Sequence, residues 1–112
     1  MNIKVKIKVD KDRLSAIVII LRHISTLKFK EANIATLLMQ QDCMSFVFKV
    51  WQNPTAKSVT LPSTVIIAMH AHFAIVMPVL AQFEQSVYRE IYTEFDKTFV
   101  NNARQREFLA LN

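Results

Sequence analysis

The sequence of 112 residues contains no glycine, and this absence limits the folds that are open to the chain. Glycine is the usual residue where the backbone takes a positive φ or passes close to a phosphate group. Phosphate-binding loops, dinucleotide fingerprints and nucleophile elbows need it, so nucleotide-dependent catalysis is not expected. Tight hairpin turns also prefer glycine, which favours helices joined by Asn, Pro and Ser/Thr turns over a meandering sheet.

The amino-terminal segment 2–9 has the clearest strand pattern in the chain. Branched apolar residues alternate with lysines, so the two sets point to opposite faces of a strand. We expect one set to lie in the core: Ile3, Val5, Ile7 and Val9. The other set forms a row of positive charge that faces solvent: Lys4, Lys6 and Lys8.

A first helix is expected after Asp10 or Asp12, either of which can cap it. Its apolar positions recur at helical spacing: Leu14, Ile17, Val18, Leu21 and Ile24. Further apolar residues widen this stripe almost to a full circle. A helix of this kind must be covered on most sides, by its neighbours or by another subunit.

A second helix is predicted from near Lys30 to about Gln52, where Asn53-Pro54 ends it. The apolar positions expected on its buried side are Ile34, Leu37, Leu38, Met44, Phe48 and Trp51. Residues 44–51 are also rich in β-forming residues. A hairpin between "SFVFKVW" and "KSVTLP" is therefore an alternative for this segment.

An uncharged run of 26 residues extends from Ser58 to Phe83. We interpret it as a short strand at 57–61, a helix that starts at Pro62 and reaches roughly Val76, and a break at Met77-Pro78. About 20 apolar residues can also span a bilayer. Two central histidines and Pro78 count against a span, and so do the other apolar helices, which would lose their partner. A membrane partner is therefore unlikely.

The last long helix has apolar residues at spacings of three or four: Leu80, Phe83, Val87, Ile91, Phe95 and Phe99. Charged residues occupy its outer surface: Glu84, Arg89, Glu90, Glu94 and Lys97. Asn101-Asn102 is expected to stop it, because asparagine can replace glycine as a carboxyl-terminal cap.

Segments 6–20 and 57–71 form a weak internal repeat, since each passes from an alternating strand through a capping residue into a dense apolar helix. The predicted fold is a single mainly α domain of α+β type over residues 1–112. It has about four helices and a small two-stranded antiparallel sheet, with a possible β-α-α repeat.

Candidate chemical groups are few. On a helix His70 and His72 point about 200° apart, so they cannot share a metal ion, which needs i, i+4 ligands. Cys43 is the single cysteine and is expected to be a small core residue. No nucleophile motif, paired carboxylate or Cys-His spacing is present. The sequence predicts no enzyme, metal, cofactor or small-molecule substrate.

Positive charge is concentrated near the amino terminus, where residues 1–30 carry eight Lys/Arg against two Asp. A strand with Lys4, Lys6 and Lys8 on one face, followed by two helices, resembles the ribbon-helix-helix repressors over residues 2 to about 42. Their dimeric β-ribbon lies in the DNA major groove, so the resemblance implies that the three lysines form the reading face. The inter-helix segment "STLKFKEAN" lacks the glycine usual there. A lysine row also has a structural interpretation, as protection of a sheet edge against aggregation.

The leading functional prediction is a small non-enzymatic interaction module that forms a helical assembly, as a homodimer or with a protein partner. DNA binding through the basic strand is the alternative. The amino terminus has no continuous apolar segment of the secretory type, so a cytoplasmic location is expected.

Overall fold

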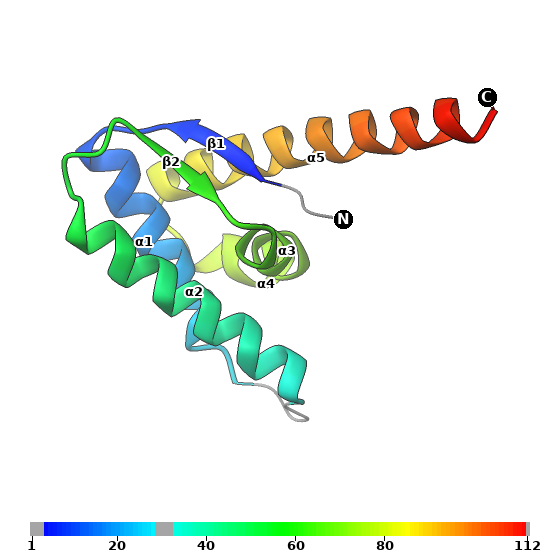
Figure 1. Ribbon diagram of the computed structural model, residues 1–112. Helices are drawn as coiled ribbons and strands as arrows, with labels where there is room; N and C mark the ends of the chain where they lie inside the picture. Colours follow the sequence, from blue (N-terminus) through cyan, green and yellow to red (C-terminus); the bar gives the residue numbers. More distant parts are fainter. Residues whose placement is uncertain (1–3, 29–32, 112) are drawn as a thin grey trace.

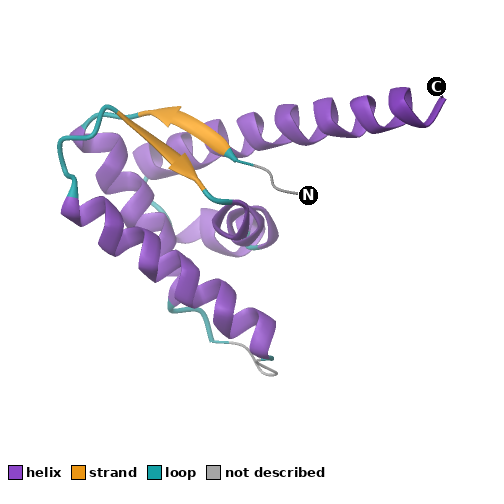
Figure 2. Ribbon diagram, in the orientation of Figure 1, coloured by secondary structure: helices purple, strands orange, loops and turns teal. Residues whose placement is uncertain are grey.

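The computed structural model describes residues 4–28 and 33–111, with backbone alone beyond Lys97. The fold is mainly helical with a two-stranded antiparallel sheet, as predicted (Figure 2). In chain order the elements are β1 (Val5–Lys8), α1 (Lys11–Ser25), α2 (Ile34–Gln52), β2 (Ser58–Leu61), α3 (Ser63–Ala71), α4 (Phe73–Val76), a 3-10 turn η1 (Met77–Val79) and α5 (Gln82–Leu111).

The two strands pair although 49 residues separate them in sequence. Val5 lies opposite Leu61 and Ile7 opposite Val59, so the apolar side chains of both strands share one face of the sheet. Val5, Ile7 and Leu61 are buried on that face. The expected alternation of β1 is therefore confirmed for residues 5–8, while Ile3 lies outside the described residues.

Helix α1 lies at the centre of the core. Its amino terminus is capped by Asp10, whose carboxylate accepts a hydrogen bond from the Arg13 amide at 2.8 Å. Of the two candidate caps, Asp10 is the one used. The helix packs against α2 and α5, and four of its side chains are fully buried: Ile17, Ile20, Leu21 and Ile24.

Helix α2 runs continuously through residues 44–51, so the hairpin alternative for this segment is wrong. Asn33 caps its start by accepting from the Thr36 amide. The predicted start near Lys30 falls outside the described residues. Figure 1 shows α2 along one flank of the molecule, next to β2.

The predicted buried side of α2 is wrong. The residues that face the core are Cys43, Phe46, Val47 and Val50. Five of the six positions assigned to the core are exposed: Ile34, Leu37, Leu38, Phe48 and Trp51. The hydrophobic pattern alone could not show which side of α2 faces the core, because α2 is apolar on two sides. Contact with α1 and α3 determines which side is buried.

The uncharged run folds inward as predicted, but its helix ends earlier than Val76. The backbone leaves helical angles at His72 (φ −109°, ψ 13°), and the chain resumes as the short helix α4. Val65, Ile66 and Met69 of α3 are buried in the core. The expected break at Met77-Pro78 is present as the 3-10 turn.

Helix α5 continues to Leu111 and extends well beyond the rest of the molecule (Figure 1). The predicted stop at Asn101-Asn102 is therefore wrong. Asparagine ends a helix by taking a positive φ, and no described residue has a positive φ. Val87, Ile91 and Phe95 are buried as expected, whereas half of Phe83 is exposed. The side chain of Phe99 lies outside the described residues.

Candidate functional site

The first candidate surface is the outer face of the two-stranded sheet. Lys6 and Lys8 are exposed on the face opposite the core, and Lys4 is exposed directly before β1. Lys6 lies opposite Thr60 and Lys8 opposite Ser58, so the pairing brings two hydroxyl side chains to the same face. The structure thus places Lys6 and Lys8 on one surface and Lys4 next to it. The structure adds Ser58 and Thr60 to this surface. Only the pairing of two strands that are 49 residues apart brings them there, so the sequence pattern did not indicate them.

This face offers ammonium groups and hydroxyls and is suited to an anionic partner. Lysine donates hydrogen bonds without accepting any, and serine and threonine do both. No acidic residue occurs in either strand, Val5–Lys8 or Ser58–Leu61. The face therefore has the chemistry of a phosphate or carboxylate contact surface.

The second candidate surface is the outer side of α2. We call it the α2 stripe, and its members are Ile34, Leu37, Leu38, Phe48 and Trp51. Each has between 51% and 75% of its surface exposed. Phe48 and Trp51 form an edge-to-face pair with ring centres 5.6 Å apart. The 19 residues of α2 carry only two charges, on Asp42 and Lys49. Two exposed but uncharged polar residues, Gln41 and Ser45, lie on the same side between the two halves of the stripe.

Sequence reasoning missed the exposure of this stripe, although a signal was present. At 100° per residue, positions 34, 37, 38 and 48 fall on one side of a helix, positions 43, 46, 47 and 50 fall on the opposite side, and position 51 falls at the border between them. Two apolar sides on one helix indicate two contacts. The first helix, which the sequence predicts to need cover on most sides, has its apolar side chains largely covered within the chain.

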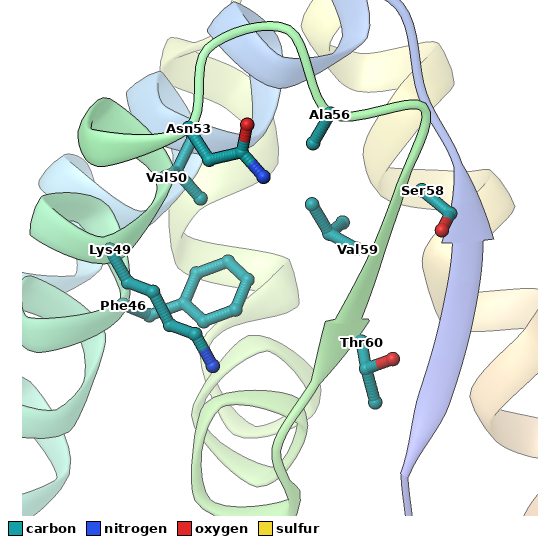
Figure 3. A pocket seen from close by; sticks show the side chains of 8 residues that line it. All are labelled: Phe46, Lys49, Val50, Asn53, Ala56, Ser58, Val59 and Thr60. Atoms are coloured by element: carbon teal, nitrogen blue, oxygen red, sulfur yellow. The ribbon is translucent and has the colours of Figure 1, made fainter.

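A hollow of about 250 Å³ lies between the last turns of α2 and strand β2 (Figure 3). Phe46 and Lys49 approach it from α2, and Val59 points into it from β2. A neighbouring hollow of about 600 Å³ shares Phe46, Lys49 and Thr60 and is also lined by Lys4. The two hollows form one groove along β2, hereafter the α2–β2 groove.

The two central histidines have different surroundings. His70 is partly exposed, stacks on Tyr92 with ring centres 4.7 Å apart, and has its Nε2 atom 3.8 Å from the carboxylate of Asp96. His72 is buried at the end of α3. The two side chains thus point to different environments, as expected for positions about 200° apart on a helix.

Burial lowers the pKa of His72 below its usual value. The unfolded chain takes up a proton there near pH 6.5, whereas the folded chain resists it to lower pH. Stability contributed by the neutral side chain is therefore complete above about pH 6.5 and is lost as the pH falls further. We expect wild type to lose more stability than His72→Gln between pH 7 and pH 5 in urea titrations. Parallel losses in the two proteins would contradict this.

The buried nucleophile candidates are held in their neutral forms. Burial, with a smaller effect of Asp42, raises the pKa of the Cys43 thiol to about 12. Burial also raises the pKa of Tyr88, whose hydroxyl donates a hydrogen bond to the Met69 carbonyl. A thiol that is almost wholly protonated at neutral pH is a poor nucleophile. Cys43 is a core residue, as expected.

No group of three His, Cys, Asp or Glu side chains within the described part of the chain is arranged to hold a metal ion. Across the same residues, none of the helices combines the length and apolarity needed to cross a membrane. Comparisons with protein-family models, curated proteins and solved structures give no match.

Proposed function

We propose that the protein is a non-enzymatic interaction module that forms a homodimer through the α2 stripe. The observation that carries this proposal is the exposure of five large apolar side chains along one side of a helix that has only two charges. An exposed apolar patch of this kind is often functional. Tryptophan and other aromatic residues are enriched where interfaces derive most of their energy.

The area of the stripe is compatible with a weak to moderate dimer. The five side chains expose roughly 500 Å² of apolar surface, in the upper range for the largest patch of a monomer. Two copies packed along the stripe would bury roughly 1,000 Å² in total, the size at which a specific interface becomes plausible. Neighbouring residues at the rim would add to this area.

The order of residues along the stripe favours an antiparallel pair of helices. Its first half is aliphatic, with Ile34, Leu37 and Leu38, and its second half is aromatic, with Phe48 and Trp51. A twofold axis crossing α2 near its middle would place the aromatic half of one copy on the aliphatic half of the other. Leu38 of one protomer would then contact Phe48 of its partner.

Sedimentation equilibrium tests the dimer directly. We expect wild type to approach twice the 13.0 kDa of the chain at micromolar concentrations, and Trp51→Glu to remain at 13.0 kDa. A charge in the interface lacks a partner and is costly to bury. Val79→Glu is the matched control, because Val79 is 63% exposed but lies outside α2. A monomeric wild type, or equal dissociation by both substitutions, overturns the proposal.

Paired charges test the antiparallel arrangement. Leu38→Lys and Phe48→Glu should each be monomeric when alone, because each buries an unpaired charge. Mixed together, the two variants should form a heterodimer, since the introduced lysine and the introduced glutamate would face each other at one contact and the native pair would remain at the other. A mixture that stays monomeric excludes this arrangement and leaves the dimer test above intact.

DNA binding through the outer face of the sheet is a second candidate. The observation that favours it is the exposure of Lys4, Lys6 and Lys8 beside Ser58 and Thr60 on a two-stranded ribbon. A ribbon of two strands fits the major groove of B-DNA. This candidate needs only one chain to supply both strands, unlike the dimeric ribbon of the repressors that the sequence resembles.

Salt dependence tests this candidate. If the ribbon contacts phosphates, the affinity for a short duplex should fall steeply with salt, and replacing the three lysines by glutamine should reduce the log–log slope by roughly 2–3 units. Lys28→Gln with Lys97→Gln is the control, because both lysines are exposed but belong to neither strand. A flat titration at low salt, or equal effects of both sets, rejects DNA binding.

A further inference from the structure

Strand β2 has a free edge. The Val9 amide donates to the Lys57 carbonyl at 2.9 Å, which continues the ladder of the sheet by one pair. In an antiparallel pair, hydrogen-bonded and non-hydrogen-bonded residues alternate. The backbone groups of Lys57, Val59 and Leu61 therefore face β1, and those of Ser58 and Thr60 point away from it.

The two edges of the sheet differ at Lys8 and in the packing of α5 against β1. On β1 the outward carbonyl of Lys8 accepts a hydrogen bond from the Arg13 guanidinium at 3.5 Å. The outward amide and carbonyl of Lys6 have no hydrogen-bond partner in the described part of the chain. Among the described residues, no hydrogen bond reaches the outward amides and carbonyls of Ser58 and Thr60. An unpaired edge of this kind is a template for another strand.

The α2–β2 groove provides the space beside this edge. A strand added to β2 would lie 4.7–4.9 Å from it, above the hollow between β2 and α2. Its inward side chains would meet Phe46, Val50 and Val59, which line the hollow (Figure 3). These inward side chains should therefore be apolar, while the alternate ones point to the outer face.

Charge favours an acidic strand. Lys49 borders the groove on the α2 side, and Lys4 borders it at the far end. Lys6 lies on the outer face directly opposite Thr60. Asp42 is the single acid among the residues that line the two hollows. An added strand would thus lie in a mainly positive field.

We propose that the edge of β2 binds an extended acidic segment of a partner protein, which joins the sheet as a third strand. Apolar side chains of the segment fill the α2–β2 groove, and its acidic side chains face the lysines. Main-chain hydrogen bonds supply affinity in this mode, and alternate side chains supply specificity. The proposal goes beyond self-association, because the groove and the α2 stripe lie on different sides of α2.

Fluorescence anisotropy with designed peptides tests it. The probe is a labelled eight-residue peptide of alternating valine and glutamate with blocked ends, and we expect saturable binding to the full chain. N-methylation of the amides on the peptide edge that pairs with β2 should weaken binding at least tenfold. N-methylation of the amides on the opposite edge should weaken binding much less. A valine-lysine peptide should bind at least tenfold more weakly than the valine-glutamate peptide. No saturable binding, indifference to methylation of either edge, or equal binding of the lysine peptide overturns the proposal.

Substitutions at Thr60 give a matched pair on the protein. Thr60→Pro removes the outward amide, which the ladder to β1 does not use, and proline is accepted at such edge positions. It should abolish peptide binding, whereas Thr60→Val, which keeps the amide, should retain it. If Thr60→Pro fails to fold, binding of the methylated peptides to the wild-type protein still tests whether the peptide pairs with β2. If the edge is instead occupied by a second copy of the chain, Thr60→Pro will dissociate a dimer that Trp51→Glu leaves intact, and the peptide assignment is then wrong.

Discussion

Replacing Ile66 by lysine is expected to unfold the protein, whereas the same replacement at the adjacent Ile67 should be tolerated. Ile66 is 1% exposed in the core and Ile67 is 55% exposed on the other side of α3. A lysine at position 66 would lose the apolar contacts of isoleucine and bury a charge without a partner. We expect destabilisation of more than about 4 kcal/mol, a large part of the roughly 5–15 kcal/mol that stabilises a typical domain.

Urea denaturation followed by circular dichroism measures both variants. Ile67→Lys should change the free energy of unfolding by less than about 1 kcal/mol, since surface substitutions usually have small effects. The two positions share one helix, so helix propensity cannot account for the difference. Equal destabilisation by both, or by neither, would mean that α3 does not present the side of Ile66 to the core.

Truncation of Tyr88 is the second large expected effect. Tyr88 is fully buried and is the largest of the fully buried side chains within the described residues. It contacts Phe73 edge-to-face, and its hydroxyl donates to the Met69 carbonyl near the end of α3. Tyr88→Ala should cost about 3–5 kcal/mol, as for other buried aromatic residues. The variant should melt well below wild type by calorimetry.

Two tyrosine-to-phenylalanine substitutions separate the contribution of the hydrogen bond to stability from that of packing. Tyr88→Phe keeps the ring but leaves the Met69 carbonyl without its donor, so we expect a loss of about 1–3 kcal/mol. The control is Tyr92→Phe, one turn further along α5, because the Tyr92 hydroxyl makes no hydrogen bond to any described residue. It should change stability by less than about 0.5 kcal/mol. Equal effects of the two phenylalanines would show that the Tyr88 hydroxyl contributes nothing.

Local patterns were sufficient to predict several features of the fold. The alternation of lysine and apolar residues predicted β1 and the exposure of Lys6 and Lys8. A carboxylate before a dense apolar segment predicted the cap of α1 at Asp10. These predictions succeed because they depend on neighbours in sequence, whose geometry is fixed by the period of a strand or helix.

Features that depend on distant residues could not be predicted in the same way. Helix α2 has two apolar sides, and only its contact with α1 and α3 decides that Phe46 is buried and Phe48 exposed. Near the break at His72, the Met69 carbonyl accepts a hydrogen bond from the hydroxyl of Tyr88, which is 19 residues away in the sequence. The α2–β2 groove likewise requires the pairing of β1 with β2, so no local pattern indicates it.

Trp51 is the single tryptophan of the chain and reports directly on the proposed burial of the outer side of α2 between two copies. The indole is 51% exposed in one copy and should be shielded from water in the dimer. Acrylamide quenching of its fluorescence should be strong in dilute solution and weaken as concentration rises, with an emission shift to shorter wavelength. Quenching and emission that are the same at every concentration up to the highest soluble one would contradict this proposal.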